Sequence, residues 1–227
     1  FIPKDHELLL YSKYKNNEIN RFIKQRFTNN EIKKINMIKN GLISFFGLNI
    51  KDNLNDIYDG EFILSTFKKE NKKRDILIVF KTKKESDLNQ ILNIDDSDYN
   101  VNQIVEIFRP KTLNLINHIM QTDDNIIICA SNKDLIDDSL KAFNNNKLRK
   151  AREEQFKYYE SRLTNKKLFL YSNKQFYDFI NLRPFNSKNI NYLTQFYFDK
   201  NKLVLNSFSL NNNNFFNTNN LNSQDNN

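Results

Sequence analysis

The sequence predicts an α+β fold of repeated units, each with a strand, two helices and an antiparallel sheet, and with a charged linker helix between them. Short apolar runs alternate with segments whose apolar residues recur every three or four positions, which are the periods of buried strands and amphipathic helices. Two runs, Leu8–Ser12 and Leu168–Ser172, are near copies, and a polar spacer and a helical pattern follow each of them. Other apolar runs flank turn residues in pairs, which predicts hairpins. A chain of 227 residues can form one large domain, or one domain and part of another.

The first unit opens with a strand at Leu8–Tyr11 and a helix at Asn17–Phe27, in which Ile and Phe recur at helical spacing. Thr28 and Glu31 have the spacing of a capping box, in which each side chain accepts a hydrogen bond from the other residue's backbone N–H. They predict the start of a second helix, which ends at Gly47. Two helices therefore follow the first strand.

A hairpin and several further elements complete the first unit. Phe62–Phe67 and Ile76–Phe80 flank a Lys-rich loop and predict the hairpin. The other expected elements are a helix at Leu88–Leu92, strands at Val101–Phe108, Leu113–Met120 and Ile126–Ala130, and a helix through Phe143 that begins with a capping box of Ser131 and Asp134. The segment Val204–Phe208 is a looser echo of Ile63–Phe67.

The charged stretch Asn146–Leu163 predicts a solvated connector helix, because oppositely charged residues such as Arg149 and Glu153 stand four positions apart. The elements expected after it are a strand at Leu168–Tyr171, a helix at Phe176–Ile180, and a hairpin of Tyr192–Phe198 and Leu203–Leu210. The chain then divides into a first unit at 1–145, a linker helix at 146–165, a shorter second unit at 166–210 and an Asn-rich tail at 211–227, which we expect to be disordered.

Few residues are suited to catalysis or to cofactor binding. The glycines Gly41, Gly47 and Gly60 are isolated, whereas phosphate-binding loops and the G-x-S-x-G nucleophile motif need glycines close together. Cys129 lies in an apolar strand, where burial keeps a thiol protonated and unreactive. The sequence therefore predicts no catalytic residue and no cofactor.

Metal ligands are equally scarce. His6 and His118 are far apart and have no second His or Cys at ligand spacing, and His118 is expected to face outward on its strand. The segment Asp96–Asn100 resembles the start of a calcium loop, but Val101 stands where that loop needs glycine. We expect no metal site.

The net charge of +8 and the pI of about 9.3 suggest an anionic partner. However, abundant Lys, Asn and Ile with scarce Gly, Ala and Arg are typical of an AT-rich genome, which explains the basicity without a partner. Basic residues concentrate around the first hairpin as a possible anionic-ligand patch: Lys68, Lys69, Lys72, Lys73, Arg74, Lys83 and Lys84. The other interpretation is that Lys at turns and edge strands discourages edge pairing. The aromatic residues occupy buried-looking positions, which argues against nucleic acid as the ligand.

Four segments of the chain carry a resemblance to a known family: Phe1–Asp5, Leu42–Asp52, Asp59–Glu61 and Asp123–Ser131. In these segments the chain resembles domain-of-unknown-function family 3352, which is common in marine picocyanobacteria. The resemblance implies an N-terminal hydrophobic anchor followed by an extracytoplasmic region of repeated α+β units. It implies no functional residues, because the family has no established activity. The short second unit and the Asn-rich tail depart from the family's pattern.

We therefore expect a non-enzymatic binding or scaffold protein of the cell envelope or thylakoid, with a protein partner of unknown identity. The chain begins at Phe1 and not at Met, and the resemblance implies a membrane tether upstream, with the protein exposed to the periplasm or the thylakoid lumen. One alternative is a cytoplasmic protein that binds nucleic acid or another anionic surface through Lys68 to Lys84. A second alternative is an enzyme of unrecognised class, which a convergent pocket of titratable residues would favour.

Overall fold

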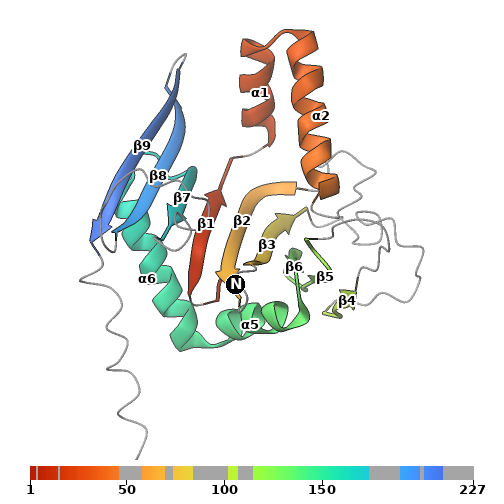
Figure 1. Ribbon diagram of the computed structural model, residues 1–227, viewed down its shortest axis with the longest axis vertical. Coiled ribbons are helices and arrows are strands. Elements are labelled where there is room, and N and C mark those ends of the chain that lie inside the picture. Colours follow the sequence, from red (N-terminus) through yellow and green to blue (C-terminus); the bar gives the residue numbers. More distant parts are fainter. Residues whose placement is uncertain are drawn as a thin grey trace, which may run out of the picture.

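The protein forms one nine-stranded sheet with four helices in the part of the chain that the computed structural model describes (Figure 1). That part comprises residues 1–3, 5–14, 16–45, 58–69, 74–83, 102–106, 115–173, 190–199 and 202–211. The elements are β1 (His6–Ser12), α1 (Asn16–Arg26), α2 (Asn29–Phe45), β2 (Tyr58–Lys68), β3 (Arg74–Thr82), β4 (Val105–Glu106), β5 (His118–Gln121), β6 (Ile126–Ala130), α5 (Lys133–Asn144), α6 (Asn146–Arg162), β7 (Leu168–Ser172), β8 (Ile190–Asp199) and β9 (Lys202–Asn211). The predicted α+β class is confirmed.

The strands lie in the order β4-β5-β6-β3-β2-β1-β7-β8-β9, and every neighbouring pair is antiparallel. The strands β1 and β7 pair inside the sheet, with five strands on one side of the pair and two on the other, and Leu10 lies opposite Leu170. The β2–β3 hairpin continues the sheet beyond β1, and the β8–β9 hairpin continues it beyond β7. The strand order is therefore symmetric about the β1–β7 pair over six strands, from β3 to β9.

Most predicted elements are found, some with different bounds. The strand expected at Leu113–Met120 begins only at His118, and the one expected at Val101–Phe108 is described only at Val105–Glu106. The helices expected at Leu88–Leu92 and Phe176–Ile180, and the tail after residue 211, lie outside the described residues. The echo of β2 at Val204–Phe208 lies in β9, whereas β8 is the strand that flanks the β1–β7 pair on the other side from β2.

The helices α5 and α6 cover the same face of the sheet. Tyr159 of α6 is 3% exposed and packs against Phe169 of β7, with 6.1 Å between the ring centroids. On the other half of the sheet, Leu135 and Ile136 of α5 join the core formed by β2, β3, β5 and β6. Ile63 of β2 packs against both cores, so that the two are continuous on one face.

The charged helix α6 is part of this core, although the sequence predicts a solvated connector. Its Arg149–Glu153 pair is present, with 3.8 Å between Nε and Oε1, but Tyr159 of the same helix packs onto Phe169 of β7. The strands of residues 1–145 and of 166–210 join in one sheet through the β1–β7 pair. The two predicted units therefore share a sheet.

The cap of α5 lies one residue later than the capping box predicted at Ser131 and Asp134. The Asn132 side chain accepts a hydrogen bond from the Leu135 N–H at 2.9 Å. Ser131 instead donates its hydroxyl to Asp75 Oδ1 at 2.8 Å and accepts from the Ile76 N–H, which ties β6 to β3. Either Ser131 or Asn132 could have capped α5 on local spacing alone. Because Ser131 is bonded to β3, Asn132 is the cap.

Candidate functional site

The helices α1 and α2 form a hairpin that stands off one end of the sheet (Figure 1). At the base of the hairpin, Glu18 of α1 forms an ion pair with Lys167, the residue that precedes β7. Lys167 also lies over the Tyr14 ring, 5.4 Å from Nζ to the centroid, and its carbonyl accepts a hydrogen bond from the Lys13 N–H at 2.6 Å. The base of the hairpin is thus fixed, while the two helices project away from the sheet.

The turn at the tip of the hairpin is fixed by the predicted capping box. The Thr28 N–H and hydroxyl donate to Glu31 Oε2 at 2.8 and 2.9 Å, and the Glu31 N–H donates to Thr28 Oγ1 at 3.4 Å. The backbone hydrogen bond from Thr28 lowers the pKa of Glu31, and the side-chain bond adds to this. Glu31 therefore serves to start α2 and is held at the tip.

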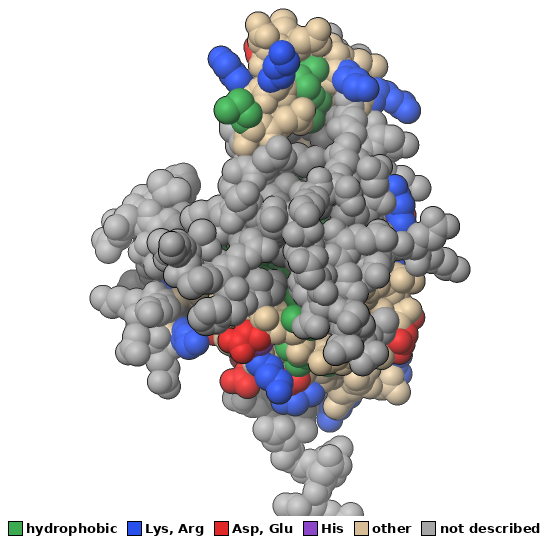
Figure 2. All heavy atoms as spheres, turned by 90° about the vertical axis from the view of Figure 1, so that its right-hand side faces the viewer, with side chains coloured by type: hydrophobic (Ala, Val, Ile, Leu, Met, Phe, Trp, Pro, Cys, Tyr) green, Lys and Arg blue, Asp and Glu red, His purple; other side chains and the backbone are tan. Residues whose placement is uncertain are grey.

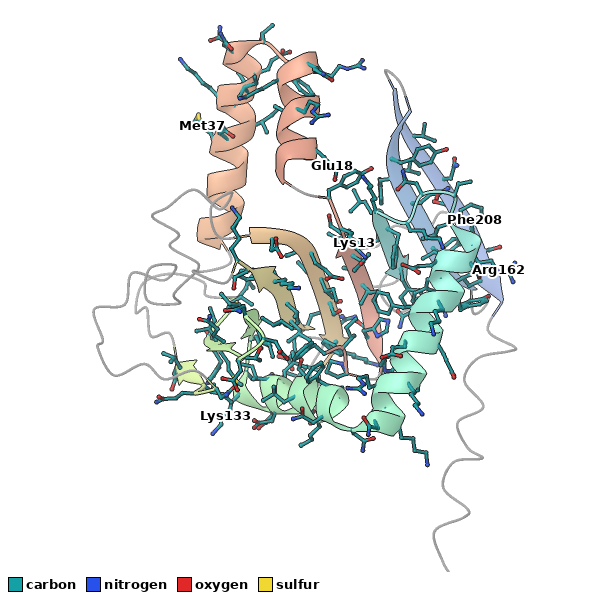
Figure 3. The ribbon with its side chains drawn as sticks, turned by 180° about the vertical axis from the view of Figure 1, so that it is seen from behind. Lys13, Glu18, Met37, Lys133, Arg162 and Phe208 are labelled. Atoms are coloured by element: carbon teal, nitrogen blue, oxygen red, sulfur yellow. The ribbon has the colours of Figure 1, made fainter. Side chains whose placement is uncertain are left out.

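The described residues of the two helices combine a few half-buried Ile side chains with many exposed ones. Ile23, Ile32 and Ile35 are half-buried. Met37 is 73% exposed and points away from α1 (Figure 3). Because residues three and four apart share a side of a helix, Met37 lies on the same side as Lys33 and Lys34. A large apolar side chain thus stands among basic ones on an uncovered helix surface.

The hairpin carries half of the net charge of the chain. Between Asn16 and Phe45 there are six basic residues and two acidic ones, a net charge of +4 out of +8. Both acidic residues have partners: Glu18 forms an ion pair with Lys167, and Glu31 accepts a hydrogen bond from Thr28. Figure 2 shows Lys and Arg side chains around hydrophobic ones at this end of the molecule. We call this the basic hairpin surface, and it comprises Arg21, Lys24, Arg26, Phe27, Lys33, Lys34 and Met37.

The basic patch predicted around the first hairpin is divided between two ends of the sheet. Lys68 and Lys69 are exposed at the end of β2, beside Arg74 at the start of β3. Lys83 follows the far end of β3, about 30 Å from Arg74 at the usual rise of a strand. Lys72, Lys73 and Lys84 lie outside the described residues. The described members therefore do not form one surface.

Two members of that patch also have acidic partners. Arg74 forms an ion pair with Glu7, whose side chain is 1% exposed. Lys69 Nζ lies 3.6 Å from Asp75 Oδ1. A charge buried as deeply as that of Glu7 needs a partner of opposite charge. The Arg74 guanidinium therefore stabilises Glu7 and is not available to an anionic ligand. This reduces the charge that the patch could offer to a ligand.

A polar network that the sequence did not predict lies between α6 and the central strands. Arg152 Nη1 donates to Gln155 Oε1 at 2.6 Å, and Gln155 Nε2 donates to the Tyr159 hydroxyl at 2.7 Å. The Tyr159 and Tyr171 rings stack at 5.1 Å, and the His6 ring meets Tyr171 edge-on at 5.3 Å. These residues come from β1, α6 and β7, so no local spacing could have indicated them.

Burial sets the protonation states in this network. It raises the pKa of Tyr159 and raises that of Tyr171 to about 12. It also lowers the pKa of His6 to about 4, an effect to which the positive charge of Arg152 adds. At neutral pH the two phenols are protonated and the imidazole is neutral. Tyr159, Tyr171 and His6 therefore carry no charge, and Arg152 is the cation of this network.

The other residues considered in the sequence are structural. Cys129 is fully buried, and burial raises the pKa of its thiol. His118, expected to face outward, is half-buried on β5 opposite Ala130. Within the described ranges, no three His, Cys, Asp or Glu residues are grouped so that they could hold a metal ion.

Among the helices of the described residues, none is both long and apolar enough to span a membrane. Comparison with known protein families, with characterised proteins and with solved structures finds no match for this chain. Any role for the basic hairpin surface must therefore be argued from its own residues.

Proposed function

We propose that the chain is a non-enzymatic binding or scaffold protein that docks on an anionic lipid surface through the basic hairpin surface. The observation that carries this proposal is the position of Met37, 73% exposed beside Lys33 and Lys34 on a helix pair with a net charge of +4. Peripheral membrane helices combine basic residues, which attract anionic headgroups, with apolar residues that enter the boundary between headgroups and acyl chains.

Lipid is favoured over nucleic acid by the apolar residue at this surface. Proteins that bind single strands stack bases on exposed aromatic rings, and duplex-binding proteins contact phosphates and base edges through polar groups. Phe27, which is 38% exposed, is the one aromatic ring of the basic hairpin surface and could serve either ligand, whereas Met37, which is 73% exposed, provides neither of these contacts. Met37 does gain free energy when it leaves water for an apolar phase. The membrane interface provides such a phase next to negative charge.

The test is sedimentation of the protein with vesicles of phosphatidylcholine alone and with added phosphatidylglycerol. We expect binding to the anionic vesicles that weakens as salt rises, because salt screens the attraction. Each basic residue near such a surface contributes about 1 kcal/mol, so the double variant Lys33→Ala, Lys34→Ala should bind roughly 30-fold more weakly. Met37→Ser should weaken binding without changing its salt dependence.

The matched control is Lys147→Ala, Lys150→Ala, which removes the same charge from exposed positions on α6. This control should bind nearly as well as the wild type. Equal losses in the two double variants would refute the assignment of the hairpin, because net charge alone would then drive binding. Tighter binding to duplex DNA than to anionic vesicles would refute lipid as the ligand and keep the hairpin as the site.

We also propose that the protein is tethered to a membrane and exposed to the periplasm or thylakoid lumen. The support for this placement is the resemblance described above together with the lipid-binding chemistry of the hairpin. Fractionation of the host with an antibody, followed by protease treatment of sealed vesicles, tests it. The expected result is membrane retention with protection inside the vesicles, and recovery in the soluble cytoplasmic fraction would exclude it.

We further propose that the sheet derives from two related units, one with β1, β2 and β3 and one with β7, β8 and β9. Support comes from the near-identical segments Leu8–Ser12 and Leu168–Ser172, which pair with each other, and from the symmetric strand order on either side. In this interpretation the helices α1 and α2 are an insertion of the first unit between its strands β1 and β2.

A further inference from the structure

The strand β9 forms one edge of the sheet (Figure 1). All ten of its residues, Lys202 to Asn211, pair with β8 in continuous register. In the described part of the chain, no strand pairs with the outer side of β9. An edge of this length presents a row of backbone donors and acceptors that another strand can use.

The outward-facing backbone groups of β9 can be identified from its pairing. In antiparallel ladders, the pairs that do not exchange backbone hydrogen bonds bring their side chains closest together. Thr194 and Ser207 form such a close pair, with 2.8 Å between their hydroxyl oxygens. The N–H and C=O of Ser207 therefore point outward, and those of Leu205 and Ser209, two positions away on either side, do so as well.

The side chains along this edge do not guard it against pairing. Leu205 is 57% exposed and Phe208 is 36% exposed. From Leu203 to Asn211 the strand has no charged residue and no proline, and its pairing with β8 shows no bulge. Charged residues, prolines and bulges are the usual means by which proteins protect an edge strand. An uncharged edge is unexpected in a chain whose charged residues make up 27% of the sequence.

We propose that β9 pairs antiparallel with β9 of a second copy of this chain, so that two sheets join into one across a two-fold axis. The opposite edge favours this partner, because β4 is described over only Val105–Glu106 and offers two residues to a head-to-tail contact. Pairing of β9 with itself offers a ladder of up to ten residues and closes after two copies. The single charged residue of β9, Lys202, is its first residue, so an antiparallel ladder of β9 with itself would place it at the Asn211 end of the other copy's strand, and no like charges would face each other.

Sedimentation equilibrium of the purified protein tests this proposal, and salt dependence is part of the readout. Each copy carries a net charge of +8, so salt should strengthen the dimer by screening the repulsion between copies. Lipid binding by the hairpin should weaken with salt, so the two interactions respond in opposite directions. We expect a monomer–dimer equilibrium with no larger species.

Two variants address the edge by different means. Leu205→Lys places a charge on the ladder, and Ser209→Pro removes an outward N–H that β8 does not use. Each should weaken the dimer by about tenfold or more, the effect of about 1.4 kcal/mol. The controls are Leu148→Lys, which adds the same charge at a 41% exposed leucine on α6, and Ser209→Ala, which keeps the N–H. Both controls should dimerise like the wild type.

Hydrogen exchange on the wild-type protein gives a test without substitutions. The amides of Leu205, Ser207 and Ser209 should become protected as protein concentration rises, while the amides of β4 should not change. A monomer at all concentrations and salts would overturn the proposal. So would a dimer that the edge variants leave intact, or a series of species larger than the dimer.

Discussion

His6 and Glu7 are adjacent ionisable residues of β1, and the fold buries them with different partners. Glu7 forms an ion pair with Arg74 across β2, and removal of either partner of such a buried pair commonly costs about 3–5 kcal/mol. His6 lies against Tyr171 under α6, where burial and the charge of Arg152 oppose its protonation. The buried Glu7 side chain thus has a positively charged partner, whereas the buried His6 side chain is held in its neutral form.

The lowered pKa of His6 predicts a loss of stability in mild acid. The imidazole has a pKa of about 4 in the folded protein against 6.5 in the unfolded chain. Between these values the unfolded chain takes up a proton that the folded protein does not, so the free energy of unfolding falls as the pH is lowered. From pH 6.5 to pH 5 the fall should be about 2 kcal/mol. Urea denaturation at the two pH values measures it.

The variant His6→Gln should lack this part of the pH dependence, because glutamine does not titrate. His118→Gln, the same substitution at the other histidine, is the control and should keep it. An identical pH dependence in wild type and His6→Gln would show that His6 can be protonated within the fold. It would then count against the burial of the network beneath α6.

At the scale of elements, the sequence predicted what depends on local spacing. The strand β1, the helices α1 and α2 and the β8–β9 hairpin follow from apolar periods and turns within a few residues of each other. The Thr28–Glu31 cap was also predictable, because both of its partners lie within one turn. The Asn132 cap was not, because Ser131 is engaged by Asp75 from a strand far away in sequence.

The basic hairpin surface was missed because its basic residues are spread singly or in pairs over two helices. The search for lysine clusters led instead to the first β-hairpin. One signal was present: Met37 lies outside the half-buried stripe of Ile32 and Ile35 and follows Lys33 by four positions. In α6, likewise, Phe156 and Tyr159 stand three apart within the charged run and indicate its buried side.

For the whole molecule, the pairing of β1 with β7 joins segments about 160 residues apart, and local patterns carry no information on such contacts. The sequence repeat suggested two units, but only the structure places both in one sheet. Leu9 and Phe169, both fully buried, belong to the same core cluster although they come from different predicted units.

This sharing predicts that residues 1–145 do not fold alone. Without β7 and α6, the β1 strand becomes an edge, and Leu9 and Tyr11 lose the core that buries them. We expect the fragment 1–145 to show no cooperative thermal unfolding by circular dichroism, and co-expression with 146–227 to restore it. Cooperative unfolding of 1–145 by itself would contradict the shared core and make the first unit an independent domain.

The helical hairpin leaves the sheet after Ser12, and Ser12 is paired with Phe62 in the returning strand β2. The points of departure and return are thus neighbours in one ladder, so the excursion can change in length or sequence while the strand pairing stays the same. The hairpin therefore has the geometry of an insertion, and a designer could replace it with another segment between the same two residues at little cost to the sheet.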